Sequence, residues 1–204
     1  MYCDMHTERC GIKGGWTRVA YFDVRNAACP SGDLLLDTYP QRMCRRRASG
    51  CASIIYQSNG VSYSNVCGRV TGYASLTVDA LAYYRPGAGL DSVYVDGISI
   101  THGSPRKHVW TFATDHEGSC RIKDIPFIGE DIYCENTDYS TSNRRRLWDG
   151  QGCRLAENCQ RSGQPWFCHT VPIVTNDYLE VRVCQDSDEN NERVALEQVE
   201  IYVY

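Results

Sequence analysis

The sequence predicts a mainly β protein: a disulfide-rich antiparallel sheet or sandwich with long irregular loops and one or two short helices. Three observations support this class. Apolar and polar residues alternate in several segments, helix signals are sparse, and twelve cysteines are spread over nearly the whole chain of 204 residues. Because such a chain buries one sizeable core and shows no internal repeat or clear linker, a single domain at 1–204 is the simplest organisation.

Segments rich in Val, Ile, Thr, Tyr and Phe predict strands along the chain. Near the C-terminus, Leu179, Val181 and Val183 would face one side of a strand and Glu180 and Arg182 the other, which is typical of a half-buried strand. The last residues alternate in the same way, so we expect these two strands to form an antiparallel pair around the acidic turn between them. The predicted strands are 16–24, 52–56, 92–100, 108–114, 179–183 and 199–203.

Helices are predicted in only two places. The stronger signal covers residues 75–84, where Leu76, Ala80, Leu81 and Tyr84 recur on one face and Arg-Pro-Gly follows. A second short turn is expected at 154–158. The stretch 117–174 is long and irregular and contains five cysteines, so it needs disulfides to be ordered.

The cysteines are interpreted as a disulfide framework, which indicates a secreted protein. The paired Cys-x(2–4)-Cys spacing of structural zinc sites does not occur. Connectivity stays open, but we expect short loops such as Cys44–Cys51 and Cys153–Cys159 to close locally. All twelve are expected to be bridged: Cys3, Cys10, Cys29, Cys44, Cys51, Cys67, Cys120, Cys134, Cys153, Cys159, Cys168 and Cys184.

The net charge of −4 is unevenly distributed. Residues 177–204 carry the acidic excess and the rest of the chain is slightly basic, so the two parts are complementary between molecules and predict self-association. An acidic, disulfide-rich chain lacks the electrostatic footprint of a nucleic-acid binder. No apolar stretch approaches the roughly 20 residues of a membrane span. The N-terminus lacks the regions of a signal peptide, so we expect a mature or trimmed form.

Two arginine triplets and two tryptophans are the candidate binding residues. Arginine binds carboxylate, sulfate or phosphate through paired hydrogen bonds. The expected ligand is therefore a partner's carboxylates, an anionic surface or a glycan. Solvated loop charges or an internal salt-bridge network is the competing interpretation of the triplets. The two tryptophans lie beside Asp149, Gln151 and Gln164 in the sequence, and a sugar-binding site needs such polar side chains next to its aromatic rings. Burial in the core is the competing interpretation, because most aromatic rings in proteins are buried. The candidates are Arg45, Arg46, Arg47, Arg144, Arg145, Arg146, Trp148 and Trp166.

The acidic run 186–192 is the candidate metal site. Asp186, Asp188 and Glu189 offer the oxygen ligands that Ca²⁺ prefers, without the spacing and glycine of an EF-hand. A solvated turn is the competing interpretation. No other cofactor is expected.

An enzyme hypothesis would start from His102 and His108, with Asp96 and Asp115 as orienting carboxylates and Ser104 as nucleophile. The serine lacks the Gly-x-Ser-x-Gly elbow that exposes a nucleophile, and bridged cysteines leave no thiolate. We therefore expect a non-catalytic protein, with a hairpin in this segment whose two histidines satisfy backbone groups or lie on the surface.

The opening at 1–25, with Tyr-Cys-Asp-Met at 2–5 and Gly-Gly-Trp-Thr-Arg-Val-Ala at 14–20, resembles fibrinogen-related domains. Residues 14–204 are similar to a poorly characterised family of secreted or ectodomain proteins of sponges and cnidarians. Its hallmarks here are the segments 60–69, 94–103, 108–112, 147–153, 165–168 and 199–203. The resemblance implies an extracellular setting.

These observations predict a non-catalytic extracellular structural or binding protein. We expect a self-assembling or partner-assembling component of an extracellular or biomineral-associated, skeletal matrix. A lectin-like carbohydrate-binding module is the alternative. Its expected partners are extracellular proteins or further copies of the chain.

Overall fold

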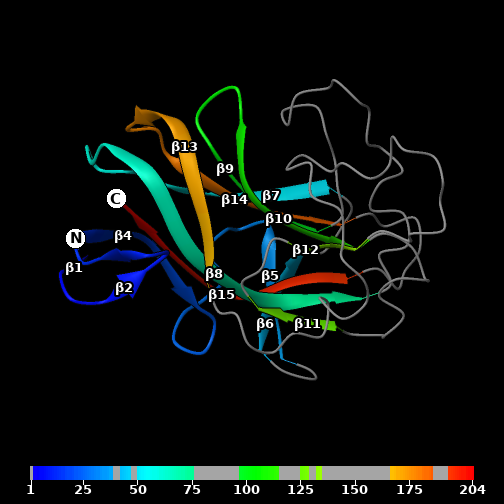
Figure 1. Ribbon diagram of the computed structural model, residues 1–204. Helices are drawn as coiled ribbons and strands as arrows, with labels where there is room; N and C mark the ends of the chain where they lie inside the picture. Colours follow the sequence, from blue (N-terminus) through cyan, green and yellow to red (C-terminus); the bar gives the residue numbers. More distant parts are fainter. Residues whose placement is uncertain are drawn as a thin grey trace.

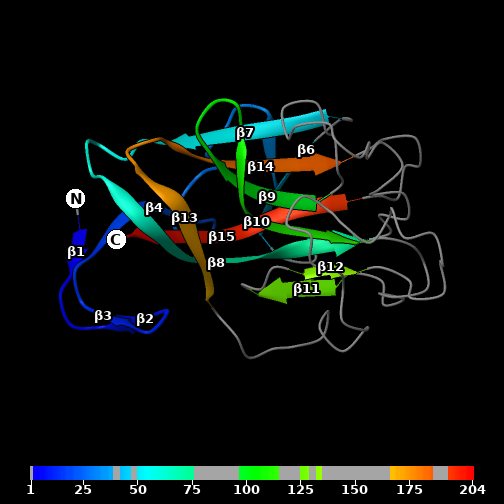
Figure 2. The ribbon, with the colours of Figure 1, turned by 45° about the horizontal axis from the view of Figure 1, so that its top comes forward.

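The computed structural model describes residues 2–38, 42–46, 50–75, 97–114, 125–128, 132–134, 166–185 and 193–204. Two large β-sheets lie face to face in this part of the chain, with a short hairpin beside them (Figures 1 and 2). The predicted mainly β, antiparallel, disulfide-bonded fold is confirmed. The described residues contain no helix, and accordingly none there is long and apolar enough to cross a membrane.

The eight-stranded sheet is organised around β15 (Arg193–Val203). On one side β15 pairs along its length with β8 (Tyr63–Ser75), and on the other with β4 (Trp16–Asp23) and β6 (Met43–Arg46). The outer edge of β8 pairs with β13 (Phe167–Thr175) and β11 (Ile125–Ile128). Two further strands complete this antiparallel sheet: β1 (Tyr2–Asp4), which pairs with β4, and β5 (Leu34–Asp37), which pairs with β6.

The five-stranded sheet has the order β12, β10, β9, β14, β7. Its pairs are antiparallel except β10 with β12. The strands are β7 (Gly50–Tyr56), β9 (Gly97–His102), β10 (Lys107–Thr114), β12 (Ile132–Cys134) and β14 (Leu179–Gln185).

The core lies between the two sheets. Alternate residues of β15 enter it from one side and alternate residues of β14 from the other, and all are nearly free of solvent contact. Burying each such side chain contributes about 1.5–3 kcal/mol. These core residues are Val199, Ile201 and Val203 of β15 with Leu179, Val181 and Val183 of β14.

The expected pairing of the last two strands is wrong. β14 and β15 lie in different sheets, and each has both edges paired to strands distant in sequence. β14 is also buried on both faces rather than half-buried. On its polar face the side chain of Arg106 covers Glu180, to which it donates from Nε at 2.5 Å and from Nη2 at 3.1 Å. The acidic run between the strands lies outside the described residues.

The helix prediction at 75–84 is not confirmed at its first residue, because Ser75 ends strand β8. Residues 76–84 and 154–158 lie outside the described part. The predicted strands at 16–24, 52–56 and 108–114 are confirmed closely. Of the strand expected at 92–100, residues 97–100 belong to β9, which extends to His102, and residues 92–96 lie outside the described part.

Three disulfides are described: Cys10–Cys168, Cys29–Cys44 and Cys51–Cys184. The expected Cys44–Cys51 loop is wrong, because Cys51 lies directly opposite Cys184 on β7 and β14, and Cys44 bonds Cys29 instead.

Complete pairing is also wrong, because Cys3 and Cys67 are free thiols. Cys67 lies opposite Cys168, but that sulfur is bonded to Cys10. The side chain of Cys134 and the residues Cys120, Cys153 and Cys159 lie outside the described part.

A two-stranded hairpin, β2 (Glu8–Arg9) and β3 (Ile12–Lys13), packs on the eight-stranded sheet. Its two turn residues, Cys10 and Gly11, have φ of 50° and 74°, as a tight hairpin turn of the mirror-image type requires. Cys10 and Ile12 pack with Trp166 against a small buried cluster of Trp16, Cys67 and Tyr202. The hairpin therefore covers a second apolar patch.

Candidate binding face on the eight-stranded sheet

We call the surface of the eight-stranded sheet that is turned away from the five-stranded sheet the outer face. Strand alternation places Glu200 and Tyr202 of β15 there, because their neighbours Val199, Ile201 and Val203 point into the core. Tyr202 lies opposite Cys67 and Glu200 lies opposite Arg69 on β8, so all four share this face.

A register shift in β4 adds two residues to the outer face. Ile201 is paired with Ala20 but the next residue, Tyr202, is paired with Arg18, so β4 has one extra residue at this point. An extra residue reverses the alternation beyond it. Arg18 on one side of the shift and Tyr21 on the other therefore both point outward.

Arg18 stacks on two tyrosines. Its guanidinium carbon lies 4.8 Å from the ring centroid of Tyr2, directly across the β1–β4 ladder, and 4.6 Å from that of Tyr21. Both rings are half exposed, at 51% and 48%. A cation over an aromatic face at such a site contributes about 0.5–1 kcal/mol.

Arg9 of the hairpin stacks in the same manner. Its guanidinium carbon lies 4.6 Å from the ring centroid of Trp166 and 4.2 Å from that of Tyr202. Its Nη2 also pairs with Asp4 Oδ2 at 3.0 Å. The guanidinium of Arg69 approaches Trp166 at 5.2 Å. Arg9 therefore anchors the hairpin to the sheet.

Asp4 is held as a carboxylate by the loop that follows it. The pKa of Asp4 is lowered to about 2, first by the backbone N–H of Thr7, which donates to Oδ1 at 2.9 Å, and further by the Thr7 side chain, the His6 backbone N–H and the charge of Arg9. The loop and the Arg9 ion pair thus stabilise each other.

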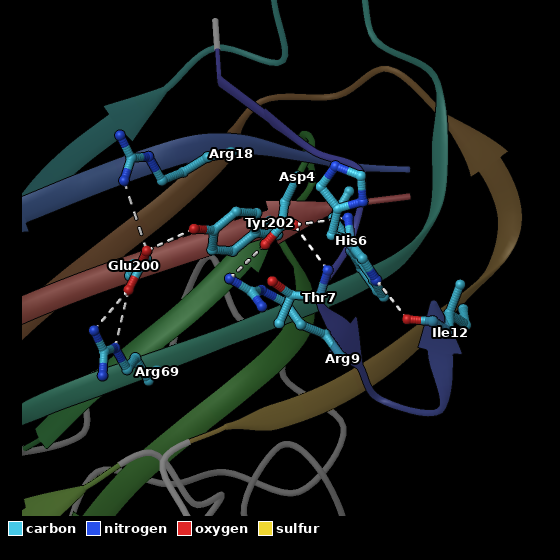
Figure 3. A network of polar contacts seen from close by, with 10 residues as sticks. Asp4, His6, Thr7, Arg9, Ile12, Arg18, Arg69, Glu200 and Tyr202 are labelled. Atoms are coloured by element: carbon cyan, nitrogen blue, oxygen red, sulfur yellow. Dashed lines mark hydrogen bonds and ion pairs between the residues drawn. The ribbon is translucent and has the colours of Figure 1, made fainter. Parts of the chain in front are cut away.

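Glu200 lies between Arg18, Arg69 and Tyr202, so it connects the two arginine stacks (Figure 3). It is buried, and its Oε2 accepts from Arg69 Nε at 3.0 Å and is 2.9 Å from Arg69 Nη2. Its Oε1 accepts from the Tyr202 hydroxyl at 2.7 Å, while Arg18 Nη1 lies 3.7 Å away, longer than a hydrogen bond. Burial, and then the hydrogen bond to Glu200, raise the pKa of Tyr202.

Together these residues form what we call the arginine–aromatic cluster. It places three guanidinium groups among four aromatic rings, with two carboxylates between them. Arg18 and its tyrosines form the exposed rim, whereas Arg9 is largely enclosed. The members are Tyr2, Asp4, Arg9, Arg18, Tyr21, Arg69, Trp166, Glu200 and Tyr202.

Three sulfur atoms lie close together where the hairpin turn packs on the sheet. The Sγ atoms of Cys10, Cys67 and Cys168 are all within 4.8 Å of one another. Two of them form the disulfide that ties the hairpin to β13, and the third belongs to the buried thiol of Cys67, whose pKa is raised to about 12 by burial.

Of the predicted binding residues, Trp166 lies in the cluster. Arg45 and Arg46 lie on β6, which pairs with β15 at Ala195 and Leu196, away from Glu200. Arg46 is mostly buried and pairs with Asp33 at 3.5 Å, and Arg45 donates to the Arg46 carbonyl at 3.3 Å. This agrees with the competing interpretation of an internal network. Arg47, Arg144, Arg145, Arg146 and Trp148, and the calcium candidates Asp186, Asp188 and Glu189, lie outside the described residues.

The two histidines of the enzyme hypothesis lie on β9 and β10. His102 is buried, and its Nδ1 lies 3.0 Å from Oδ2 of Asp177. The carboxylates named with them, Asp96 and Asp115, lie outside the described residues. The carbonyl of Asp177 accepts from the Tyr63 hydroxyl at 3.1 Å. The ring of His108 is edge-on to His169, with centroids 6.2 Å apart. These contacts connect strands of both sheets to the loop before β14.

Sequence reasoning missed Arg9, Arg18, Arg69, Tyr2 and Tyr21 because they come from four separate strands. One signal was available: Glu200 is the acidic residue in an otherwise apolar and aromatic terminal segment, 199–204. A carboxylate in a strand that is buried on both faces requires a cationic partner.

Comparison with known protein families, curated proteins and solved structures gives no match to this chain.

Proposed function

We propose that this protein is a non-catalytic structural and binding component of an extracellular matrix, and that the arginine–aromatic cluster binds sulfated or carboxylated glycans. The three disulfides among the described residues are compatible with an oxidising, extracellular environment. The skeletal or mineral-associated setting expected from the sequence stays a prediction.

The stack of Tyr2, Arg18 and Tyr21 is the observation that carries this proposal. Guanidinium groups bind sulfate and carboxylate through paired hydrogen bonds, and aromatic faces pack against the apolar faces of sugar rings. The contact of Arg18 with Glu200 is longer than a hydrogen bond, so its donors can turn to an anion without breaking one. The half-exposed rings of Tyr2 and Tyr21 both contact the same guanidinium, so they border the place where that anion would bind.

Affinity for a sulfated glycan tests the proposal. Heparin is compared with its desulfated form by calorimetry, using the wild-type protein, Arg18→Ala, Tyr21→Ala and the control Arg42→Ala. Arg42 is exposed, and its described contact is a 3.3 Å hydrogen bond to the carbonyl of Val24, the residue that follows β4.

We expect heparin to bind more tightly than its desulfated form, with an affinity that falls as salt rises. Arg18→Ala should weaken binding by about 1.5–3 kcal/mol, roughly 10- to 150-fold, which is the range for a hydrogen bond to a charged group. Arg42→Ala should have little effect. Equal binding of the two glycans, or equal losses for Arg18→Ala and Arg42→Ala, would contradict the proposal.

Contact with a partner protein or a second copy is the second candidate. It is supported by Ile173 and Val174 of β13, which are 78% and 66% exposed and lie where the pairing with β8 is interrupted. Light scattering against concentration and salt tests it. Growth of large species that Ile173→Asp suppresses supports assembly, and a monomer under every condition excludes it.

A further inference from the structure

Cys168 has two sulfur neighbours but is bonded to only one of them. Its Sγ forms a disulfide with Cys10, in the hairpin turn, and the Sγ of Cys67 lies within 4.8 Å of both. Cys67 and Cys168 are directly opposite each other on β8 and β13. Opposed residues of an antiparallel pair have Cα atoms about 4.5–5.5 Å apart, within the range that a disulfide spans.

The same molecule contains a bonded pair in that arrangement. Cys51 and Cys184 are directly opposite on β7 and β14 and form a disulfide with their Cα atoms 4.1 Å apart. A cross-strand disulfide is therefore compatible with the strand geometry of this fold. Cys67 and Cys168 differ from this pair because the Cys168 sulfur is already bonded to a third cysteine, Cys10 of the hairpin.

We propose that these three cysteines form a thiol–disulfide exchange site with two disulfide isomers. The Cys67 thiolate attacks Sγ of Cys168, the Cys67–Cys168 bond forms, the Cys10–Cys168 bond breaks, and the electron pair leaves with Cys10. The proton lost by Cys67 to solvent is balanced by the one that Cys10 gains. Two sulfurs are oxidised and one is a thiol before and after, so no external oxidant or reductant is consumed.

Burial controls the rate of this exchange. Only the thiolate attacks a disulfide, and burial raises the pKa of Cys67 to about 12. Near neutral pH Cys67 is therefore held almost entirely as the thiol, and its thiolate fraction rises about tenfold with each pH unit below that pKa. Three charged or titratable groups face Cys67. The charge of Arg9 lowers its pKa and that of Glu200 raises it, and Tyr202 lies directly opposite it on β15.

Exchange changes how the hairpin is held, and this consequence depends on the proposed function. The Cys10–Cys168 bond links the hairpin to a strand 158 residues away in sequence. After exchange the covalent link joins β8 to β13 instead, and the hairpin keeps its noncovalent contacts, chiefly the Arg9 stack and the ion pair with Asp4. The isomer with free Cys10 should therefore have a looser arginine–aromatic cluster and a lower glycan affinity.

Disulfide mapping of the whole chain tests the exchange without using any ligand. Cys3→Ser is the background, because the exposed Cys3 thiol would attack disulfides of other molecules. The oxidised protein is held without added thiol at pH 7 and at pH 10, quenched in acid, alkylated in denaturant and mapped by mass spectrometry. We expect alkylation to move from Cys67 to Cys10 and a Cys67–Cys168 linkage to appear, about 1,000-fold faster at pH 10, at a rate independent of protein concentration.

Two variants complete the test. Cys10→Ser, refolded with a glutathione redox pair, should form the Cys67–Cys168 disulfide, whereas Cys67→Ser should keep Cys10–Cys168 at both pH values. If Cys10 stays unalkylated at pH 10 and Cys10→Ser keeps both remaining thiols free, the exchange site is excluded. If the isomers form but bind heparin equally, the exchange site stands and only its link to the glycan face fails.

Discussion

Replacing Glu200 by Gln perturbs the arginine–aromatic cluster at its centre. The carboxylate is buried, receives two contacts from Arg69 and one from the Tyr202 hydroxyl, and lies 3.7 Å from Arg18. Removing one partner of a buried ion pair costs about 3–5 kcal/mol. Because the Arg69 side chain is about one-third exposed, water compensates part of that loss. Gln also keeps one acceptor, so we expect a loss of about 2 kcal/mol of unfolding free energy.

Urea unfolding followed by tryptophan fluorescence measures this loss. Glu197→Gln is the matched control, because Glu197 lies on the same strand but is only partly buried, and it should change stability by less than about 0.5 kcal/mol. The double variant with Arg69→Gln should be less destabilised than the sum of the single variants, because the two side chains contact each other. Additive losses, or a Glu200→Gln loss equal to the control, would refute the account of this network.

Three further predictions concern other parts of the molecule. Gly68→Ala should lower the free energy of unfolding by about 1–3 kcal/mol or more, because a Cβ there would lie 2.7 Å from the Phe167 ring and 2.8 Å from the Glu200 carbonyl oxygen. Gly32→Ala, where a Cβ would meet nothing within 4 Å, is the control and should change stability little. Equal effects in thermal or urea unfolding would contradict the packing described. The hydrogen bond with His102 lowers the pKa of Asp177 below its ordinary 3.8. The pair therefore stabilises the fold above about pH 4, and this stabilisation is lost as the pH falls further. Asp177→Asn should flatten the dependence of the unfolding free energy on pH in that range, and an unchanged profile would contradict this role. The Cys51–Cys184 disulfide links residues 133 positions apart, and the Cys29–Cys44 disulfide links residues 15 apart. Removing the first should lower the free energy of unfolding by about 1–2 kcal/mol more than removing the second, because a longer loop gains more chain entropy in the unfolded state. The reverse order in denaturant unfolding would contradict this loop-entropy argument.

The strands could largely be predicted from sequence, but their neighbours could not. Alternation at 179–183 identifies β14 correctly, since Leu179, Val181 and Val183 are core residues. The same alternation predicted solvent contact for Glu180, which is wrong because Arg106, 74 residues earlier in the chain, covers it. Local sequence does not contain this contact.

The disulfides illustrate the same limit. The short spacing between Cys44 and Cys51 favoured local closure, but each sulfur is bonded to whichever cysteine the sheet places beside it. Cys51 and Cys184 become neighbours only through the pairing of β7 with β14. Cysteine spacing therefore indicated a framework correctly but could not give its connectivity.

The candidate site was predictable only in part. Trp166 was identified as a ligand candidate because a tryptophan lay among polar residues in an irregular segment, and it does contact Arg9 and Arg69. Arg18 and Tyr21 could not be assigned to one face, because alternation alone places positions three apart on opposite faces of a strand. Only the register shift opposite Tyr202 brings them together.

Chemical-shift mapping of a sulfated oligosaccharide on the isotope-labelled protein tests the central claim most directly, because it locates the ligand. The account predicts that backbone amide signals of Tyr2, Arg18, Tyr21 and Arg69 shift in a saturable manner and that Arg18→Ala abolishes the shifts. Shifts gathered instead on Arg45 and Arg46 of β6, or no shifts at all, would contradict a binding role for the arginine–aromatic cluster.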